Sequence, residues 1–387
     1  MTEEIKLMTC TKLCTGPLAK GCEQCIVGRK SVIFVTGLCH YKCFYCPISD
    51  DKRNKDIVKI NEHIIINPDE QEGLNQLFAE IENCQSLGAS LTGGDPLAKL
   101  DRTIYYIKAL KEKFGKGFHI HLYSSLPFVT QDAMIRLSEA GLDEIRFHAD
   151  LDDIASWEKM YFAEGLKMNI GIEIPSIPGS IEKTKELINF AKKTGFIEFV
   201  NLNELEFSDI SNDNFEEHGF FVKNSLSYGI MGSEAVAKEA IEYAKNIGMP
   251  THYCTAGFKD KVQLANRLRL RSQKVAKEYD LEDEEGLLER GEILPLTDKE
   301  NSSSEMVVEG GLDLEAIKQE LQEEFEIPDE LIDNVGYRLL IAPWVIKEIF
   351  EELNERKEEF TWIEDVEISI VKEYPTDDHF LVERNPL

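Results

Sequence analysis

The chain has 387 residues, of which 42% are apolar, and its 72 acidic residues against 43 basic ones give a formal net charge of −29. This charge argues against a nucleic-acid-binding surface, and the composition excludes the collagen-like and disordered classes. No run approaches the roughly 18 to 20 apolar residues that span a bilayer, and the acidic start MTEEIKLM is unlike a signal peptide. We therefore expect a cytoplasmic protein with no membrane or nucleic-acid partner.

The first 30 residues carry four of the nine cysteines, Cys10, Cys14, Cys22 and Cys25, with C-x3-C-x7-C-x2-C spacing. This segment is too short to bury a core of its own. In a reducing compartment, clustered cysteines favour metal binding over disulfides, and four soft ligands suit either zinc or a second iron–sulfur cluster. The spacing is compatible with both metals, and reduced, unpaired thiols are the remaining alternative.

From residue 31 to residue 257, β-rich runs alternate with helical stretches, the pattern of βα units that build a parallel sheet. The predicted helices each close on a glycine, which is common at helix C-termini. Six βα units predict an α/β fold, a partial (β/α)6 TIM-like barrel, with an open doubly wound sheet as the alternative; in both, the reactive end is the carboxyl edge of the strands. The predicted strands are 31–36, 89–92, 118–124, 144–148, 168–174 and 199–207, and the helices are 71–88, 101–115, 130–141 and 181–195.

Three further cysteines follow the first predicted strand in the run TGLCHYKCFYCP. Cys39, Cys43 and Cys46 have C-x3-C-x2-C spacing. Three thiolates on one loop can hold three irons of a four-iron cluster, which leaves the fourth iron open to a reactant. The alternatives are a zinc knuckle that takes a ligand such as His40, and a ferredoxin-type cluster completed by a distant cysteine.

A strand followed by this triplet, with Tyr45 before the last cysteine, resembles the radical S-adenosylmethionine (SAM) superfamily. In that family an aromatic residue at this position lies against the adenine of SAM. A glycine turn after the second strand receives the methionyl amino group, and the absence of a Cβ permits that approach. The matching run here is LTGGDP, with Gly93, Gly94, Asp95 and Pro96, in which Asp95 replaces the more usual Glu.

Within the superfamily the chain is most similar to uncharacterised archaeal-type proteins related to pyruvate formate-lyase activating enzyme. The segments GRKSVIFVTGLC, LTGGDPL, FHIHLYS and DEIRFH carry this resemblance. It implies a [4Fe–4S] cluster at the triplet, SAM as cofactor, and reductive cleavage of SAM to a 5′-deoxyadenosyl radical that abstracts hydrogen from an unidentified substrate. Activation or modification of a protein is one form of that reaction. A ferredoxin or flavodoxin is implied as the electron donor.

Polar residues at alternate strand positions should point into the barrel, because the outer strand faces must be apolar to pack under helices. On the third predicted strand, His119, His121 and Tyr123 are candidate catalytic residues. On the fourth, the resemblance makes Arg146 and His148 candidates for binding SAM. The alternative is that these groups satisfy one another inside the barrel.

Cys254, in the run THYC, is a further candidate, either as a hydrogen donor to a radical or as an additional metal ligand; a buried neutral thiol is the alternative. Residues 258–387 are expected to form a small α+β accessory domain. Its acidic stretch 281–330 contributes −15 of the net charge, and the runs 364–374 and 379–384 could pair as a hairpin.

The predicted organisation is a Cys-rich metal-binding segment (1–30), a radical SAM partial barrel (31–257) and a C-terminal accessory domain (258–387). Two other functions stay open at this point. One is a radical SAM methyl- or sulfur-transferase. The other is a non-catalytic iron–sulfur or zinc protein that carries electrons or acts as a sensor, although such a protein has no need of the glycine turn at residues 93–96.

Overall fold

The protein is described by a computed structural model that covers residues 13–207, 215, 217–224, 227–296 and 312–387. By its internal contacts the chain separates into two compact units, Met1–Arg267 and Leu268–Leu387. The first unit contains the cysteines. The domain borders expected after residues 30 and 257 stay predictions.

A ten-stranded sheet forms the centre of the first unit, over the residues described. Seven neighbouring strands of this sheet run parallel, in the spatial order β12–β9–β8–β7–β6–β5–β2. Short antiparallel strands extend both edges, β1 beside β12 and the pair β3–β4 beside β2. The strands are β1 (Cys14–Thr15), β2 (Lys30–Phe34), β3 (Lys59–Ile60), β4 (His63–Ile64), β5 (Gly88–Thr92), β6 (His119–Ser125), β7 (Glu144–His148), β8 (Asn169–Ser176), β9 (Phe199–Glu204) and β12 (Thr251–Cys254).

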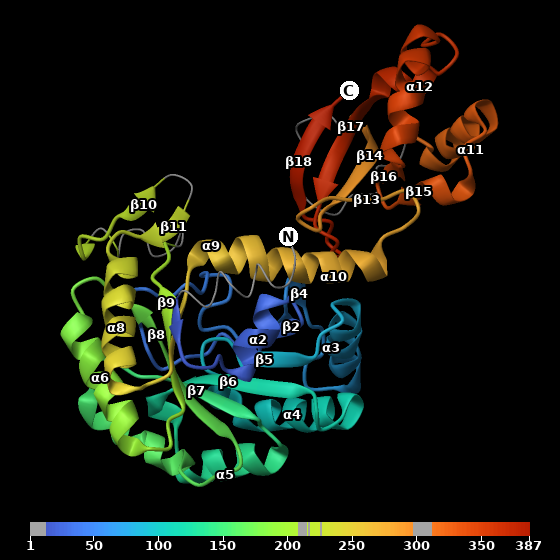
Figure 1. Ribbon diagram of the computed structural model, residues 1–387. Coiled ribbons are helices and arrows are strands. Elements are labelled where there is room, and N and C mark those ends of the chain that lie inside the picture. The colour runs from blue at the N-terminus through green and yellow to red at the C-terminus, as the bar shows by residue number, and fades with distance from the viewer. Residues whose placement is uncertain (1–12, 208–214, 216, 225–226, 297–311) are drawn as a thin grey trace. The chain divides into compact units, whose positions relative to one another are not determined.

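Helices surround the outer side of the curved sheet (Figure 1). They cover apolar residues at alternate strand positions, such as Ile145 and Phe147 of β7, which are fully buried. Helix ends follow local chemistry: the hydroxyl of Thr130 accepts the backbone N–H of Ala133 at the start of α5, and Gly141, with φ of 99°, ends it. The outer helices are α3 (Gln71–Asn83), α4 (Leu100–Phe114), α5 (Gln131–Ala140), α6 (Ile181–Thr194) and α8 (Ser233–Ile247).

The predicted fold class is confirmed: the unit is α/β with a mostly parallel central sheet, and β2, β5, β6, β7, β8 and β9 match the six predicted runs. Sequence reasoning missed β12, which adds a seventh parallel strand beside β9. Its four residues, Thr251–Cys254, are too few for an alternating pattern to stand out.

Helix α2 (Lys20–Ile26) lies on the inner side of the sheet, unlike the outer helices of the unit. It contacts β2, β5 and β6. A Cβ on Gly21 would come within 2.3 Å of His121 Nδ1 and 2.6 Å of Arg146 Nη2, and both of these side chains belong to the inner strand face. The described part of the Cys-rich segment is thus built into the barrel, and Gly21 permits its close approach.

In its described residues, the second unit has a six-stranded antiparallel sheet with helices α11 and α12 on one face. Its predicted hairpin is confirmed as β17 paired with β18. None of the described helices has the length and apolar content that crossing a bilayer requires. The elements are β13 (Leu281–Glu282), β14 (Leu288–Pro295), α11 (Leu314–Phe325), β15 (Ile332–Val335), β16 (Arg338–Ile341), α12 (Pro343–Glu355), β17 (Val366–Glu373) and β18 (Leu381–Pro386).

Candidate active site at the carboxyl edge of the sheet

The cysteine triplet lies on the loop that follows β2. Cys39, Cys43 and Cys46 are free, half-buried thiols without regular secondary structure around them. Burial and the neighbouring thiols Cys46 and Cys39 together raise the pKa of Cys43 to about 11. Uncompensated thiolates are therefore unfavourable here, and binding iron would supply the missing positive charge.

The base of this loop is closed by backbone contacts. Gly37 N–H donates to Lys55 O at 2.9 Å, and Asn54 N–H donates to Gly37 O at 2.9 Å. A Cβ on Gly37 would lie 1.8 Å from Lys52 O, so only glycine fits. These hydrogen bonds join the two ends of the loop, so the three thiols lie on one short closed segment of chain.

Sequence reasoning missed a polar clamp behind the loop. Thr36 Oγ1 donates to Asp56 Oδ1 at 2.9 Å, and the buried guanidinium of Arg102 donates to both Asp56 oxygens at 2.6 and 3.3 Å. Arg102 also donates to Val35 O at 3.1 Å and to Asp69 at 2.6 and 2.7 Å. The clamp ties the end of β2, the far side of the loop and α4 together.

The glycine motif packs directly on the start of the cysteine loop. Gly94 N–H donates to Thr36 O at 2.7 Å. A Cβ on Gly93, whose φ is 142°, would lie 2.3 Å from Thr36 O, and one on Gly94 would lie 2.3 Å from Leu38 O. Both glycines are needed for this contact, which places the motif next to the triplet at the same edge of the sheet.

The carboxylate of Asp95 is fully engaged within the protein. It accepts hydrogen bonds from Leu97 N at 2.9 Å, Ser125 N at 2.8 Å, Ser125 Oγ at 2.5 Å and Ser124 Oγ at 3.1 Å. Burial raises its pKa although these donors oppose the shift. Asp95 thus joins the ends of β5 and β6 and caps the short helix that begins at Pro96. The part of the glycine motif that can contact a ligand is therefore its backbone.

A hydrogen bond joins Tyr45 of the cysteine loop to His148 at the end of β7. Their Oη and Nε2 atoms are 2.9 Å apart, and His148 Nδ1 lies 3.3 Å from the carbonyl oxygen of Glu173. Because a carbonyl only accepts, His148 carries its proton on Nδ1 and accepts at Nε2 from the tyrosine hydroxyl. Burial lowers the pKa of His148, which favours this neutral form.

Arg146 lies deeper in the barrel and is occupied by internal partners. Its Nε donates to Glu144 at 2.5 Å, and its Nη1 donates to Glu173 at 2.8 Å and to the hydroxyl of Tyr123 at 3.2 Å. That hydroxyl therefore donates to His121 Nε2, 3.0 Å away. These candidate residues form a buried network, the arrangement that the sequence left open as the alternative.

His119 belongs to the same network. Lys30 Nζ donates to its Nδ1 at 2.9 Å, and its Nε2 lies 3.6 Å from Glu144. Burial and the charge of Lys30 lower the pKa of His119 to about 3, so the ring is neutral.

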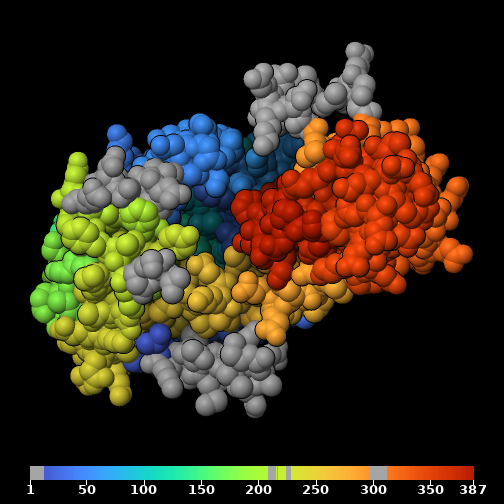
Figure 2. Space-filling model, turned by 90° about the horizontal axis from the view of Figure 1, so that it is seen from above, coloured from blue at the N-terminus to red at the C-terminus, as the bar shows by residue number. Residues whose placement is uncertain are grey.

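Aromatic residues cover the triplet from the side of β9. Phe44, inside the cysteine loop, is stacked on Phe220 and meets Phe215 and His218 edge-on. In Figure 2 blue and yellow-green parts of the chain lie close to each other at the surface. Aromatic packing of this kind keeps water away from one side of the triplet.

The remaining predicted ligands lie apart from the triplet. Cys14 is on β1, Cys22 and Cys25 are on α2, and Cys254 ends β12. Cys10 lies outside the described residues. The metal site predicted for Cys10, Cys14, Cys22 and Cys25 stays a prediction.

The residues present at the triplet fit a [4Fe–4S] cluster. Three free thiols lie on one closed loop beside the glycine backbone at the reactive edge of the sheet. No three His, Cys, Asp or Glu side chains in the described part of the chain are placed to hold a single metal ion. A cluster does not require such convergence, because each thiolate binds a different iron.

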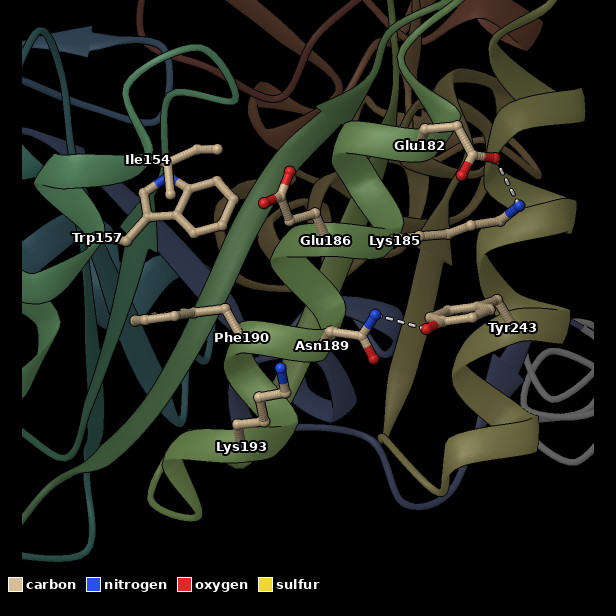
Figure 3. A pocket seen from close by; sticks show the side chains of 9 residues that line it. All are labelled: Ile154, Trp157, Glu182, Lys185, Glu186, Asn189, Phe190, Lys193 and Tyr243. Carbon is tan, nitrogen blue, oxygen red and sulfur yellow. Dashed lines mark hydrogen bonds and ion pairs between the residues drawn. The ribbon is translucent and has the colours of Figure 1, made fainter.

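A pocket of about 600 Å³ lies outside the sheet, between α6, α8 and η3 (Ile154–Ala163) (Figure 3). Lys185 pairs with Glu182 at 2.9 Å, and Asn189 donates to the hydroxyl of Tyr243 at 2.5 Å. None of the residues that line this pocket is a predicted site residue. The candidate site therefore rests on the carboxyl edge and not on this groove.

Residues 33–218 match the radical SAM superfamily, and residues 306–387 match a domain of unknown function (DUF8061). A protein of Methanocaldococcus jannaschii is 35% identical over 380 residues, which cover 96% of this chain and 93% of that protein. Its provisional name is glycyl-radical enzyme activating enzyme.

Two solved structures resemble the chain more distantly. Methylornithine synthase is 13% identical with a TM-score of 0.38, over 66% of this chain and 82% of that one. A radical SAM methyltransferase from Kitasatospora setae, with tryptophan and a SAM analogue bound, is 11% identical with a TM-score of 0.35, over 52% of this chain and 41% of that one. Likeness at this level supports no statement on chemistry.

Proposed function

Because the chain belongs to the radical SAM superfamily, we propose that it is an activating enzyme that takes a hydrogen atom from a glycine of a partner protein. The observation that carries this proposal is the 35% identity to a protein named as a glycyl-radical enzyme activating enzyme, over nearly the full length of both chains. Similarity on this scale includes the accessory unit as well as the barrel.

The family implies a [4Fe–4S] cluster and SAM. When bound, they supply the difficult step, reductive cleavage of SAM to methionine and a 5′-deoxyadenosyl radical that removes hydrogen from the substrate. In this proposal Cys39, Cys43 and Cys46 hold three of the irons. The backbone of Gly93 and Gly94 binds the methionyl end of SAM.

Tyr45 orients the adenosyl end in the same proposal. Its hydroxyl donates to the neutral His148, which is itself fixed by the carbonyl of Glu173. These two hydrogen bonds fix the orientation of the tyrosine ring. The aromatic rings packed on Phe44 cover one side of the loop. A fixed site that is shielded on this side suits radical chemistry, because stray hydrogen donors would quench the reaction.

Two partners follow from the proposal. A low-potential ferredoxin or flavodoxin supplies one electron for each cleavage. The substrate is a protein whose glycine-containing segment reaches the carboxyl edge of the barrel. No residue of this chain needs to become a radical, because the hydrogen atom passes from the glycine Cα directly to the 5′-deoxyadenosyl radical, which becomes 5′-deoxyadenosine.

Isotope transfer tests the proposal even while the partner protein is unidentified. The source organism is grown on glycine in which both hydrogens of the Cα are deuterium. An extract of these cells is then incubated with the anaerobically reconstituted enzyme, SAM and dithionite. We expect deuterium in 5′-deoxyadenosine by mass spectrometry, and none with the Cys43→Ala variant. Formation of 5′-deoxyadenosine without deuterium would contradict glycine as the hydrogen source while leaving radical SAM cleavage intact.

A further inference from the structure

Three thiols outside the triplet come together inside the barrel. Cys22 and Cys25 lie three residues apart on α2, so their side chains share one face of that helix. Cys254 is the last residue of β12. Each of Cys22 and Cys25 lies close enough to Cys254 to influence its charge.

Strand register places Cys254 on the same side as α2. In the parallel pair of β9 and β12, Asn201 faces His252 and Asn203 faces Cys254, and paired residues project to the same face of a sheet. Asn201 Nδ2 lies 3.3 Å from Cys22 Sγ as a donor, so this face is the inner one. Cys254 therefore also projects into the barrel. Its partner Asn203 is the next inward-facing residue of β9 after Asn201, which contacts Cys22.

Two buried nitrogen atoms beside α2 have no acceptor among the described residues. His121 and Arg146 are 0% and 3% exposed, and in the described part of the chain neither His121 Nδ1 nor Arg146 Nη2 has a hydrogen-bond partner. Since Nε2 of His121 accepts from Tyr123, its Nδ1 carries the proton. A buried donor without a partner costs about 1–3 kcal/mol, so an acceptor is expected at this place.

The charges around the thiols suit an anionic group. Positive side chains lie near the thiols, Arg146 and Lys30 near Cys25 and Lys259 near Cys254, and they partly offset the burial that raises the pKa of both thiols. Glu173 is already satisfied, because its oxygens accept from Arg146, Asn201 and Asn203.

We propose that Cys22, Cys25 and Cys254 bind a second iron–sulfur cluster inside the barrel, separate from the one at the triplet. Thiolates and cluster sulfides would accept the free hydrogen bonds of Arg146 and His121, and would balance the buried positive charge. A cluster suits these thiols better than one zinc ion, because its sulfides add hydrogen-bond acceptors that a zinc ion lacks. Of the set expected from sequence, the proposed cluster keeps Cys22 and Cys25 and adds Cys254.

Metal content tests this site independently of SAM cleavage. The full chain with Cys39, Cys43 and Cys46 all changed to Ala is reconstituted anaerobically with iron and sulfide. We expect about four irons and about four sulfides to remain per chain, as for one cubane cluster, with an electron paramagnetic resonance signal on reduction. Adding Cys254→Ser should remove both, whereas adding Cys84→Ser, a buried thiol on the outer side of the sheet, should leave them unchanged.

Circular dichroism and thermal unfolding show whether each variant is folded. In the otherwise unchanged chain, Cys254→Ser should lower the iron content from about eight to about four per chain. A folded triplet variant without iron would overturn the proposal, as would one bound zinc, or iron that survives Cys254→Ser. Because no readout depends on 5′-deoxyadenosine, this result is separate from the outcome for the proposed function.

Discussion

The two ends of the barrel interior use polar side chains in different ways. At the carboxyl edge, hydrogen bonds tie loops together, as in the Thr36–Asp56–Arg102 clamp, and leave the thiols and the glycine backbone facing a ligand. In the deeper half around α2, Arg146 pairs with the buried Glu144 and with Glu173, whose side chain is 13% exposed. Changes at the edge should therefore affect SAM binding, and changes to the deeper ion pairs should affect folding.

The largest expected effect is on stability, from Arg146→Met. This change leaves Glu144 and Glu173 buried without their cation, and breaking such a pair costs about 3–5 kcal/mol. The matched control is Arg136→Met, which removes an exposed, solvent-screened pair with Asp101 and should change stability little. Urea unfolding measures both, and similar losses for the two variants would contradict the distinction between the buried and exposed pairs.

Gly94→Ala should have the next largest effect, and mainly at the edge. Its Cβ would lie 2.3 Å from the backbone oxygen of Leu38, so the glycine motif or the cysteine loop must shift, at a cost of about 1–3 kcal/mol. We expect weaker SAM binding by equilibrium dialysis. Gly117→Ala, where a Cβ meets nothing within 4 Å, is the control and should bind SAM normally. Unchanged binding in Gly94→Ala would show that the motif is not at the SAM site.

Acid should loosen the clamp through Asp56. Burial raises its pKa, but hydrogen bonds from Arg102, Lys99 and Thr36 lower it to about 2 in the folded protein. Its stabilisation is thus present above the unfolded value of about 3.9 and is lost as pH falls towards 2; with allowance for partial exposure it amounts to about 1–2 kcal/mol. Asp56→Asn should remove this part of the pH dependence, measured by urea unfolding at pH 5 to 2. Identical pH profiles for both proteins would exclude the clamp as an acid-sensitive contact.

Tyr45→Phe should have the smallest effect. It removes one hydrogen bond to His148 but keeps the ring, so we expect a loss of about 1 kcal/mol in SAM binding and no loss of iron. Tyr45→Ala, which also removes the ring, should weaken binding further. If both variants bind SAM as tightly as the unchanged chain, the proposed contact with adenine is wrong.

Sequence periodicity predicted the inner strand faces well. The alternation at His119, His121 and Tyr123 determines which side chains point inward, because the period of a strand is two. It could not show that Arg146 pairs with Glu173 or that Asp56 pairs with Arg102. Those partners are 27 and 46 residues apart, and tertiary packing alone brings them together.

The glycine motif and Cys254 also have contacts that the sequence pattern could not predict. The resemblance identified Gly93 to Pro96, but the carboxylate of Asp95 serves Ser124, Ser125 and Leu97, which no local pattern indicates. The strand that carries Cys254 is four residues long, so its inward direction appears only from its register with β9. Spacing finds ligands that share a loop; it does not find ligands on different elements.

Formation of 5′-deoxyadenosine tests the central claim most directly. The unchanged chain, Cys43→Ala and Cys84→Ala are reconstituted anaerobically, supplied with SAM and dithionite, and assayed by liquid chromatography. The first and third should produce 5′-deoxyadenosine and the second should not, because Cys43 belongs to the triplet and Cys84 is buried at the end of α3. Product from folded Cys43→Ala at the rate of the unchanged chain would contradict the assignment of the triplet as the site of SAM cleavage.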